Sequence, residues 1–220
     1  AGTALRVALP ALGPGERADV ILDFRGRTGQ SIVMRNVARS PFPKGDVADP
    51  RTTGQIMMFR VSVPLGSTPI ATLNGIGRPV TPLTATANPR RLLLFEGMDS
   101  YGRLKPALGT LSGAFDFTDP ATETPALNSV EVWDIFNTTE DAHPIHVHLV
   151  QYQVLSRQGF RATQNSTTGA LSNIQLLGQP RPPEPNESGW KDTAIMYPGE
   201  VTRIIAKFDR PGEYVWHCHI

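Results

Sequence analysis

The chain has 220 residues, of which 21 are Lys or Arg and 20 are Asp or Glu, so its formal net charge is +1. This balance, without a block of basic residues, argues against a nucleic-acid or anionic-membrane partner, and no apolar run reaches the roughly 18 residues of a membrane-spanning helix. Glycine and proline number 20 each, which favours many turns and short strands over long helices.

The first part of the chain contains three runs rich in β-branched and aromatic residues, at residues 17–24, 31–36 and 55–63. Runs of this kind predict strands. Residues 64–89 are rich in Pro, Gly and Thr and carry a single charge, Arg78. We expect this segment to be an extended connection between domains.

Six further strands are predicted, at residues 91–96, 130–137, 145–155, 193–197, 201–208 and 213–218. Residues 158–189 are polar and proline-rich and are expected to form a long surface loop. Several short strands at turn-rich spacing, without alternating helices, predict an all-β sandwich or barrel.

Metal-ligating side chains are confined to two short clusters. All five histidines and the only cysteine fall in His143-Pro144-Ile145-His146-Val147-His148 and in His217-Cys218-His219. Imidazole nitrogen and thiolate sulfur are the ligands of copper, zinc and iron sites. The sequence therefore predicts a metal centre.

The alternation of side chains along a strand divides these ligands into two groups. His146 and His148 are expected on one face of their strand, and His217 and His219 on one face of the other. Cys218 points the opposite way, and His143, which precedes its strand, is free to join it. If the strands are neighbours, four imidazoles form one centre and Cys218 belongs to another.

The two groups suit different copper chemistry. A thiolate with imidazoles and a weak axial ligand is the blue-copper electron-transfer arrangement. An all-imidazole cluster suits copper that binds and reduces a small molecule, and the bonded path through His217-Cys218-His219 would join the two centres.

Both clusters resemble the third and fourth copper motifs of multicopper oxidases. Further similarity lies in Glu123-Thr124-Pro125-Ala126-Leu127, Gly189-Trp190-Lys191-Asp192-Thr193 and, upstream, Glu16-Arg17-Ala18-Asp19-Val20 and Ile56-Met57-Met58-Phe59-Arg60. The bacterial branch of CotA-like spore-coat laccases and phenoxazinone synthases is the most similar in these motifs. The resemblance implies cupredoxin-like Greek-key domains: the C-terminal part of a second domain in residues 1–63, a linker in 64–89 and a third domain in 90–220, truncated at its C-terminus.

The resemblance also implies a role for each ligand. His143 and Cys218 would bind the type 1 copper and His146 the type 2 copper. His148 and His217 would share one type 3 copper, and His219 would bind the other, making four copper ions in an intact enzyme. The implied reaction couples one-electron oxidation of phenols, aromatic amines or metal ions to reduction of dioxygen to water.

The family pattern is incomplete in this chain. The type 1 site also takes a second histidine and an axial ligand, and the trinuclear cluster takes His-x-His pairs from a first domain, whereas no histidine precedes His143. We therefore expect a fragment of a larger oxidase that is inactive alone and requires the N-terminal cupredoxin domain of the same chain. Its location stays open between spore coat, cell exterior and cytoplasm.

Two alternatives are left open. The chain could be a non-catalytic copper-binding or structural β-domain. It could also be a mononuclear zinc or iron enzyme in which His146 and His148 bind one ion. The second alternative leaves the His217-Cys218-His219 cluster unexplained, and no carboxylate lies among residues 149–152.

Overall fold

The computed structural model describes residues 11–64, 66 and 80–220. Among these residues the chain divides into two compact units, one containing residue 11 and residues 18–64, the other formed by residues 12–17 and Val80–Ile220. Most of the predicted linker, residues 65 and 67–79, lies outside the described residues. The domain boundaries at residues 63 and 90 therefore stay a prediction.

The first unit contains two short antiparallel ribbons. β1 (Ser31–Arg35) pairs with β4 (Gln55–Arg60), and β2 (Arg39–Ser40) pairs with β3 (Asp46–Val47). The strands expected at residues 31–36 and 55–63 are thus confirmed, but the strand expected at 17–24 is wrong. Its side chains are mostly exposed, and among the described residues no strand pairs with it. A β-branched run becomes a strand only where a partner supplies hydrogen bonds and packing.

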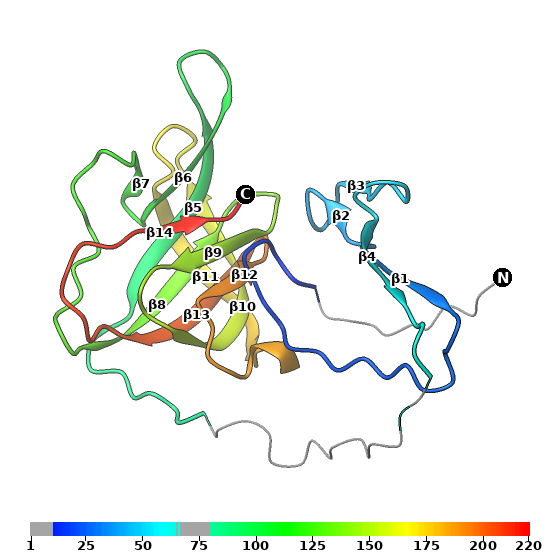
Figure 1. Ribbon diagram of the computed structural model, residues 1–220. Coiled ribbons are helices and arrows are strands. Elements are labelled where there is room, and N and C mark those ends of the chain that lie inside the picture. The colour runs from blue at the N-terminus through cyan, green and yellow to red at the C-terminus, as the bar shows by residue number, and fades with distance from the viewer. Residues whose placement is uncertain (1–10, 65, 67–79) are drawn as a thin grey trace. The chain divides into compact units, whose positions relative to one another are not determined.

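The second unit is built from two sheets (Figure 1). The larger sheet has the strand order β11-β10-β13-β8-β5-β6-β7. Its strands are β5 (Arg90–Met98), β6 (Leu104–Thr110), β7 (Gly113–Phe115), β8 (Val130–Asn137), β10 (Tyr152–Gln164), β11 (Leu171–Arg181) and β13 (Glu200–Lys207). The smaller sheet has the order β12-β9-β14, from β12 (Thr193–Met196), β9 (His143–Val147) and β14 (Trp216–Cys218).

The core of the second unit lies between these sheets. Leu92 and Ile135 of the larger sheet pack in one buried cluster with Ile145 and Met196 of the smaller sheet, and all four are fully or almost fully buried. Within the larger sheet, β5 and β8 pair in parallel, whereas the other strand pairs are antiparallel. The expectation of an all-β sandwich is confirmed.

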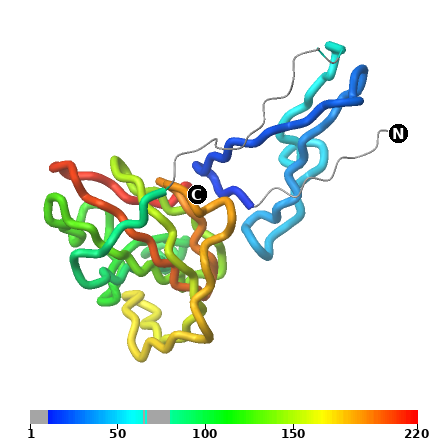
Figure 2. Tube along the Cα trace, turned by 90° about the horizontal axis from the view of Figure 1, so that it is seen from below, coloured from blue at the N-terminus to red at the C-terminus, as the bar shows by residue number. Residues whose placement is uncertain are grey.

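Two elements depart from the sequence-based expectation. The strand predicted at residues 145–155 is two strands, because Leu149 adopts a positive φ of 68° and the chain leaves β9 for β10 in the other sheet. The loop predicted at residues 158–189 is largely the β10–β11 hairpin, drawn in yellow at the edge of the unit in Figure 2. Polar side chains are compatible with a strand at a sheet edge, because one side of it faces solvent.

Helical structure is confined, among the described residues, to one short 3-10 turn, Pro185–Glu187. No helix in the described part of the chain has the length and apolar character needed to cross a membrane.

Candidate metal centre

The two ligand-bearing strands are direct neighbours in the smaller sheet. β14 pairs antiparallel with β9, so that His217 lies opposite His146 and Cys218 lies opposite Ile145. His219 continues the ladder, because its backbone N–H donates to the Pro144 carbonyl at 3.0 Å. Opposed residues share a face in an antiparallel pair, which places His146 and His217 side by side.

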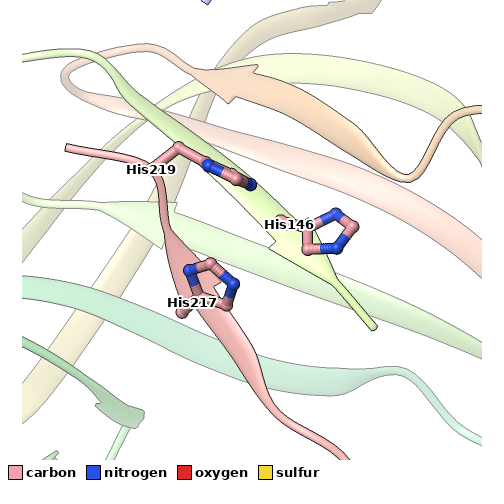
Figure 3. A group of neighbouring side chains, drawn as sticks. All are labelled: His146, His217 and His219. Atoms are coloured by element: carbon pink, nitrogen blue, oxygen red, sulfur yellow. The ribbon is translucent and has the colours of Figure 1, made fainter. Parts of the chain in front are cut away.

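Four imidazoles form one group, which we call the imidazole cluster: His146, His148, His217 and His219. Figure 3 shows His146 on β9 facing His217 and His219 on the segment of β14. One ligand nitrogen from each of these three rings lies within 4.8 Å of the other two. The ring of His148 lies 4.7 Å from that of His146, and its Nε2 is 3.0 Å from Nε2 of His217.

A second group lies on the opposite face of β14. The Sγ atom of Cys218 is 3.5 Å from Nδ1 of His143, at the first residue of β9. We call this pair the thiolate cluster. His143 is buried, with 8% of its surface exposed, whereas Cys218 is half-buried.

In each group, a hydrogen bond at one ring nitrogen of a histidine leaves the other ring nitrogen free to bind a metal. Nε2 of His143 lies 2.8 Å from the Thr139 hydroxyl. That hydroxyl accepts from the Asp141 N–H and has two partners that can only accept, the Asn137 side-chain oxygen and the Asp141 carbonyl. The hydroxyl therefore accepts from Nε2–H of His143, which leaves the Nδ1 lone pair facing Cys218. Nδ1 of His217 donates to the Cys218 carbonyl at 2.9 Å, which leaves its Nε2 for a ligand.

This pattern fits a metal centre. A ligating histidine characteristically donates its second ring N–H to a carbonyl, carboxylate or hydroxyl, which fixes the tautomer. Facing Nε2 atoms in His148 and His217, and a sulfur beside Nδ1 of His143, are donor sets that copper accepts.

Burial shifts the pKa values of several of these groups. Burial lowers the pKa of His143, partly offset by Asp141, and desolvation also lowers that of His219. Burial raises the pKa of the Cys218 thiol. The lowered pKa values favour the uncharged imidazoles, the state that binds a metal, whereas the thiol must lose its proton when it binds.

A large cavity adjoins both clusters. Its volume is about 1250 Å³, and it is bordered by ligand residues and by aromatic side chains, among them His143, Cys218, Trp133, Phe208 and Tyr214. No residue of the β10–β11 hairpin lines it.

A turn far upstream also reaches the imidazole cluster. A Cβ atom added at Gly15, whose φ is +82°, would lie 2.8 Å from the ring of His219. Arg17 forms a bidentate ion pair with Asp192, with N–O distances of 2.6 and 2.9 Å. Glu16 pairs with Lys191 at 2.9 Å, with 1% and 9% of their side chains exposed.

Sequence reasoning did not identify these contacts. Arg17 and Asp192 are 175 residues apart, and neither belongs to a ligand motif. Both lie in segments that resemble those of multicopper oxidases, and only this resemblance could have pointed to them.

Residues 86–220 match the family model described as multicopper oxidase. The chain belongs to the multicopper oxidase family. It is 42% identical to a laccase of Bacillus stratosphericus over 96% of this chain and 40% of the relative. It is 41% identical to a laccase of Bacillus subtilis (strain 168), over 96% of this chain and 39% of the relative. The resemblance inferred from the copper motifs is confirmed.

Solved structures support the fold. A laccase structure from Pediococcus acidilactici Pa5930 matches with a TM-score of 0.54 and 20% identity, over 89% of this chain and 34% of that one. This likeness confirms the cupredoxin-like fold. The chain spans about 40% of the length of the curated relatives it matches.

Proposed function

We propose that this chain supplies copper ligands of a laccase-like oxidase, with further ligands coming from outside these 220 residues. His143 and Cys218 would hold a type 1 copper. His146 would hold the type 2 copper, and His148, His217 and His219 would hold the type 3 pair. The observation that carries this proposal is the register of β9 against β14, which gathers four imidazoles on one face and leaves Cys218 beside His143 on the other.

Copper, when bound, would supply one-electron redox chemistry, with oxidation of a reducing substrate at the thiolate cluster and reduction of dioxygen at the imidazole cluster. The residues of the chain would bind the copper ions and hold them in position. Three consecutive residues, His217, Cys218 and His219, contribute to both clusters, so the two centres are held at a spacing that the backbone sets.

The cavity beside the thiolate cluster supports an aromatic reducing substrate. Trp133, Phe208 and Tyr214 border it together with His143, so a phenol or aromatic amine could lie against apolar surface close to a ligand of the type 1 copper. Dioxygen is the proposed oxidant, and a preceding cupredoxin domain is the proposed partner.

Cys218→Ser tests the thiolate cluster. Because Cys218 is the only cysteine, any thiolate-to-copper absorption band must come from it. We expect copper added to the chain to produce such a band, and we expect the Cys218→Ser variant to lose the band while the imidazole cluster still binds copper. The measurements are the visible absorption spectrum and the bound copper per chain by atomic spectroscopy.

Two results would contradict the proposal. An equally intense band in the Cys218→Ser variant would remove the type 1 assignment, and a chain that binds no copper at all would remove both clusters. Because the 220 residues contain only four imidazoles for the trinuclear centre, we expect no sustained consumption of dioxygen when a phenol is supplied to this chain alone.

A further inference from the structure

The exposed ion pair between Arg17 and Asp192 adjoins a proposed copper ligand, His146. Asp192 immediately precedes β12, which is the neighbour of β9, and its backbone carbonyl lies 2.7 Å from Nδ1 of His146. The Arg17 guanidinium contacts the Asp192 carboxylate with two nitrogens and also donates to the Gly15 carbonyl at 3.0 Å. The upstream turn is thereby fastened to the segment that touches His146.

The Thr193 hydroxyl completes a chain of hydrogen bonds. It donates to Oδ1 of Asp192 at 3.2 Å and lies 3.1 Å from Nδ1 of His146. A hydroxyl has one proton, so the bond to Asp192 leaves Thr193 only a lone pair to offer to His146. Both neighbours of Nδ1, the Thr193 hydroxyl and the Asp192 carbonyl, are then acceptors, and Nδ1 of His146 must carry the hydrogen.

This arrangement fixes the tautomer of His146. With hydrogen on Nδ1, the lone pair lies on Nε2, on the far side of the ring from Asp192 and Thr193. Nε2 is the nitrogen that remains for a metal. The direction of the Thr193 hydroxyl depends on the Asp192 carboxylate, and Arg17 holds that carboxylate by both oxygens.

Arg17 contributes little to the fold by comparison. Its side chain is 68% exposed, and exposed ion pairs between mobile side chains add little to stability. The buried contacts of the same turn, Glu16 with Lys191, anchor it independently of Arg17. Removing the guanidinium should therefore change the orientation of His146 more than the stability of the unit.

We propose that Arg17 is a positioning residue for the His146 imidazole, acting through Asp192, whose backbone carbonyl accepts from Nδ1 of His146 and whose carboxylate directs the Thr193 hydroxyl. As far as it concerns copper, this inference rests on the proposed function. The tautomer itself is a property of the metal-free chain and can be measured without copper.

The first experiment is long-range hydrogen–nitrogen NMR of the metal-free chain labelled with nitrogen-15 histidine, at mildly alkaline pH. In the parent chain we expect His146 to show a protonated Nδ1 and a bare Nε2. In Arg17→Gln, which frees both the Asp192 segment with its accepting carbonyl and the direction of the Thr193 hydroxyl, we expect part of the chain to adopt the other tautomer. Thr193→Val keeps the Asp192 carbonyl beside Nδ1 and should retain the protonated Nδ1. A spectrum of His146 that is identical in the parent chain and in Arg17→Gln would overturn the proposal.

The second experiment is a Cu(II) titration against a competing chelator, followed by electron paramagnetic resonance of the imidazole-bound ion. Loss of a group that orients a ligand typically weakens metal binding by about 10- to 100-fold, and we expect a loss in this range for Arg17→Gln and Thr193→Val. Arg17→Lys retains the charge without the bidentate contact and should lie between Arg17→Gln and the parent chain.

The chain offers a matched control for each variant. Arg103→Gln breaks a comparable exposed pair, with Asp99, and the Arg103 side chain is 73% exposed. Thr202→Val removes a buried hydroxyl that has no hydrogen-bond partner among the described residues. Both controls should leave the His146 spectrum and the copper affinity unchanged. Equal losses in Arg17→Gln and Arg103→Gln would overturn the proposal, because the effect would then follow surface charge alone.

The two levels of inference can fail separately. A parent chain that binds no copper would refute the proposed function, and the NMR comparison would then decide alone whether Arg17 positions His146. Copper binding that is the same in all variants, with unchanged tautomers, would refute the role of Arg17 and leave the proposed function standing.

Discussion

Gly15 shows how closely the backbone of the upstream turn approaches the imidazole cluster. Its φ of +82° suits glycine, and a Cβ atom at this position would lie 2.8 Å from two atoms of the His219 ring, too close for a real contact. The ring can stay where it is only if residue 15 has no side chain. Gly15 therefore affects the metal centre through both its conformation and its missing Cβ.

Gly15→Ala should displace His219 and weaken copper binding by the imidazole cluster by about 10-fold or more. Gly102→Ala is the matched control, because Gly102 has a φ of +72° and nothing within 4 Å of its added Cβ. Both variants carry the strain of a left-handed residue, about 1 kcal/mol, but only Gly15→Ala meets a ligand. Copper titration of both chains makes the comparison, and equal affinities would show that His219 tolerates the shift.

At the scale of single residues, the parts of the site that could be predicted are those whose residues lie close together in the sequence. His146 and His148, and likewise His217, Cys218 and His219, could be grouped from the sequence because strand alternation operates between near neighbours. Arg17, Thr139 and Thr193 could not be placed, because their contacts depend on turns and on side-chain hydrogen bonds. Whether the grouped residues bind copper stays a prediction until a metal is measured.

At the scale of elements, a buried arginine joins the two sheets of the second unit. Arg157 lies on β10 with its side chain fully buried, forms an ion pair with Glu187, and donates to the Ile195 carbonyl of β12 at 3.0 Å. β12 in turn pairs with β9, the strand that carries His143 and His146. Arg157 therefore links the larger sheet to the smaller sheet, which carries the metal ligands.

Arg157→Met should destabilise the second unit by about 3–5 kcal/mol, because it leaves the Glu187 carboxylate buried without its partner. Replacing both residues, Arg157→Met with Glu187→Leu, should lose less than the single change, since no unpaired charge remains. Arg181→Gln breaks partly exposed pairs with Glu184 and Glu200 and should cost only about 0–1 kcal/mol. Urea unfolding of the four chains gives the comparison, and a loss in Arg157→Met no larger than that in Arg181→Gln would refute this role.

Strands were predictable where their pairing partners had equally clear patterns, as in β8 and β13. The sequence could not show that residues 145–155 change sheets, because the change depends on a positive φ at Leu149, a residue that does not favour it. It also could not show that residues 158–189 form a hairpin, since polar edge strands and polar loops have similar compositions. In both segments the structure is determined by which strands pair, and strand pairing depends on the tertiary fold.

At the scale of the whole molecule, composition and turn-rich spacing were sufficient to predict an all-β chain, and the copper motifs were sufficient to predict the family. The division of the chain into two units was harder to predict from the sequence. Residues 12–17 belong with residues 80–220 although some 60 residues separate them in the sequence. Their attachment rests on Glu16 with Lys191 and Arg17 with Asp192, contacts that no local pattern indicates.

Two groups that the clusters bury contribute to the pH dependence of the metal-free second unit at opposite ends of the pH range. The pKa of His143 is lowered from 6.5, so as pH falls through 6.5 the unfolded chain takes up a proton that folded His143 does not, and stability decreases. The pKa of Cys218 is raised from 9.0, so as pH rises through 9.0 the unfolded chain loses a proton that folded Cys218 keeps, and stability again decreases. For these two groups, stability is therefore greatest between about pH 6.5 and 9.

Urea unfolding of the metal-free chain at a series of pH values tests this expectation. All three tryptophans, Trp133, Trp190 and Trp216, lie in the second unit, so their fluorescence reports its unfolding alone. Below about pH 10, where Tyr152 and Tyr197 with their raised pKa values do not yet contribute, Cys218→Ala should weaken the alkaline decrease and leave the acidic one. His143→Gln should weaken the acidic decrease, to which His219 also contributes, and leave the alkaline one. Bound copper should weaken the alkaline decrease as Cys218→Ala does, because Cys218 is then a thiolate in the folded chain as well as in the unfolded one. An alkaline decrease between about pH 8 and 10 that is as large in Cys218→Ala as in the parent chain would show that burial of this thiol does not govern the stability of the unit.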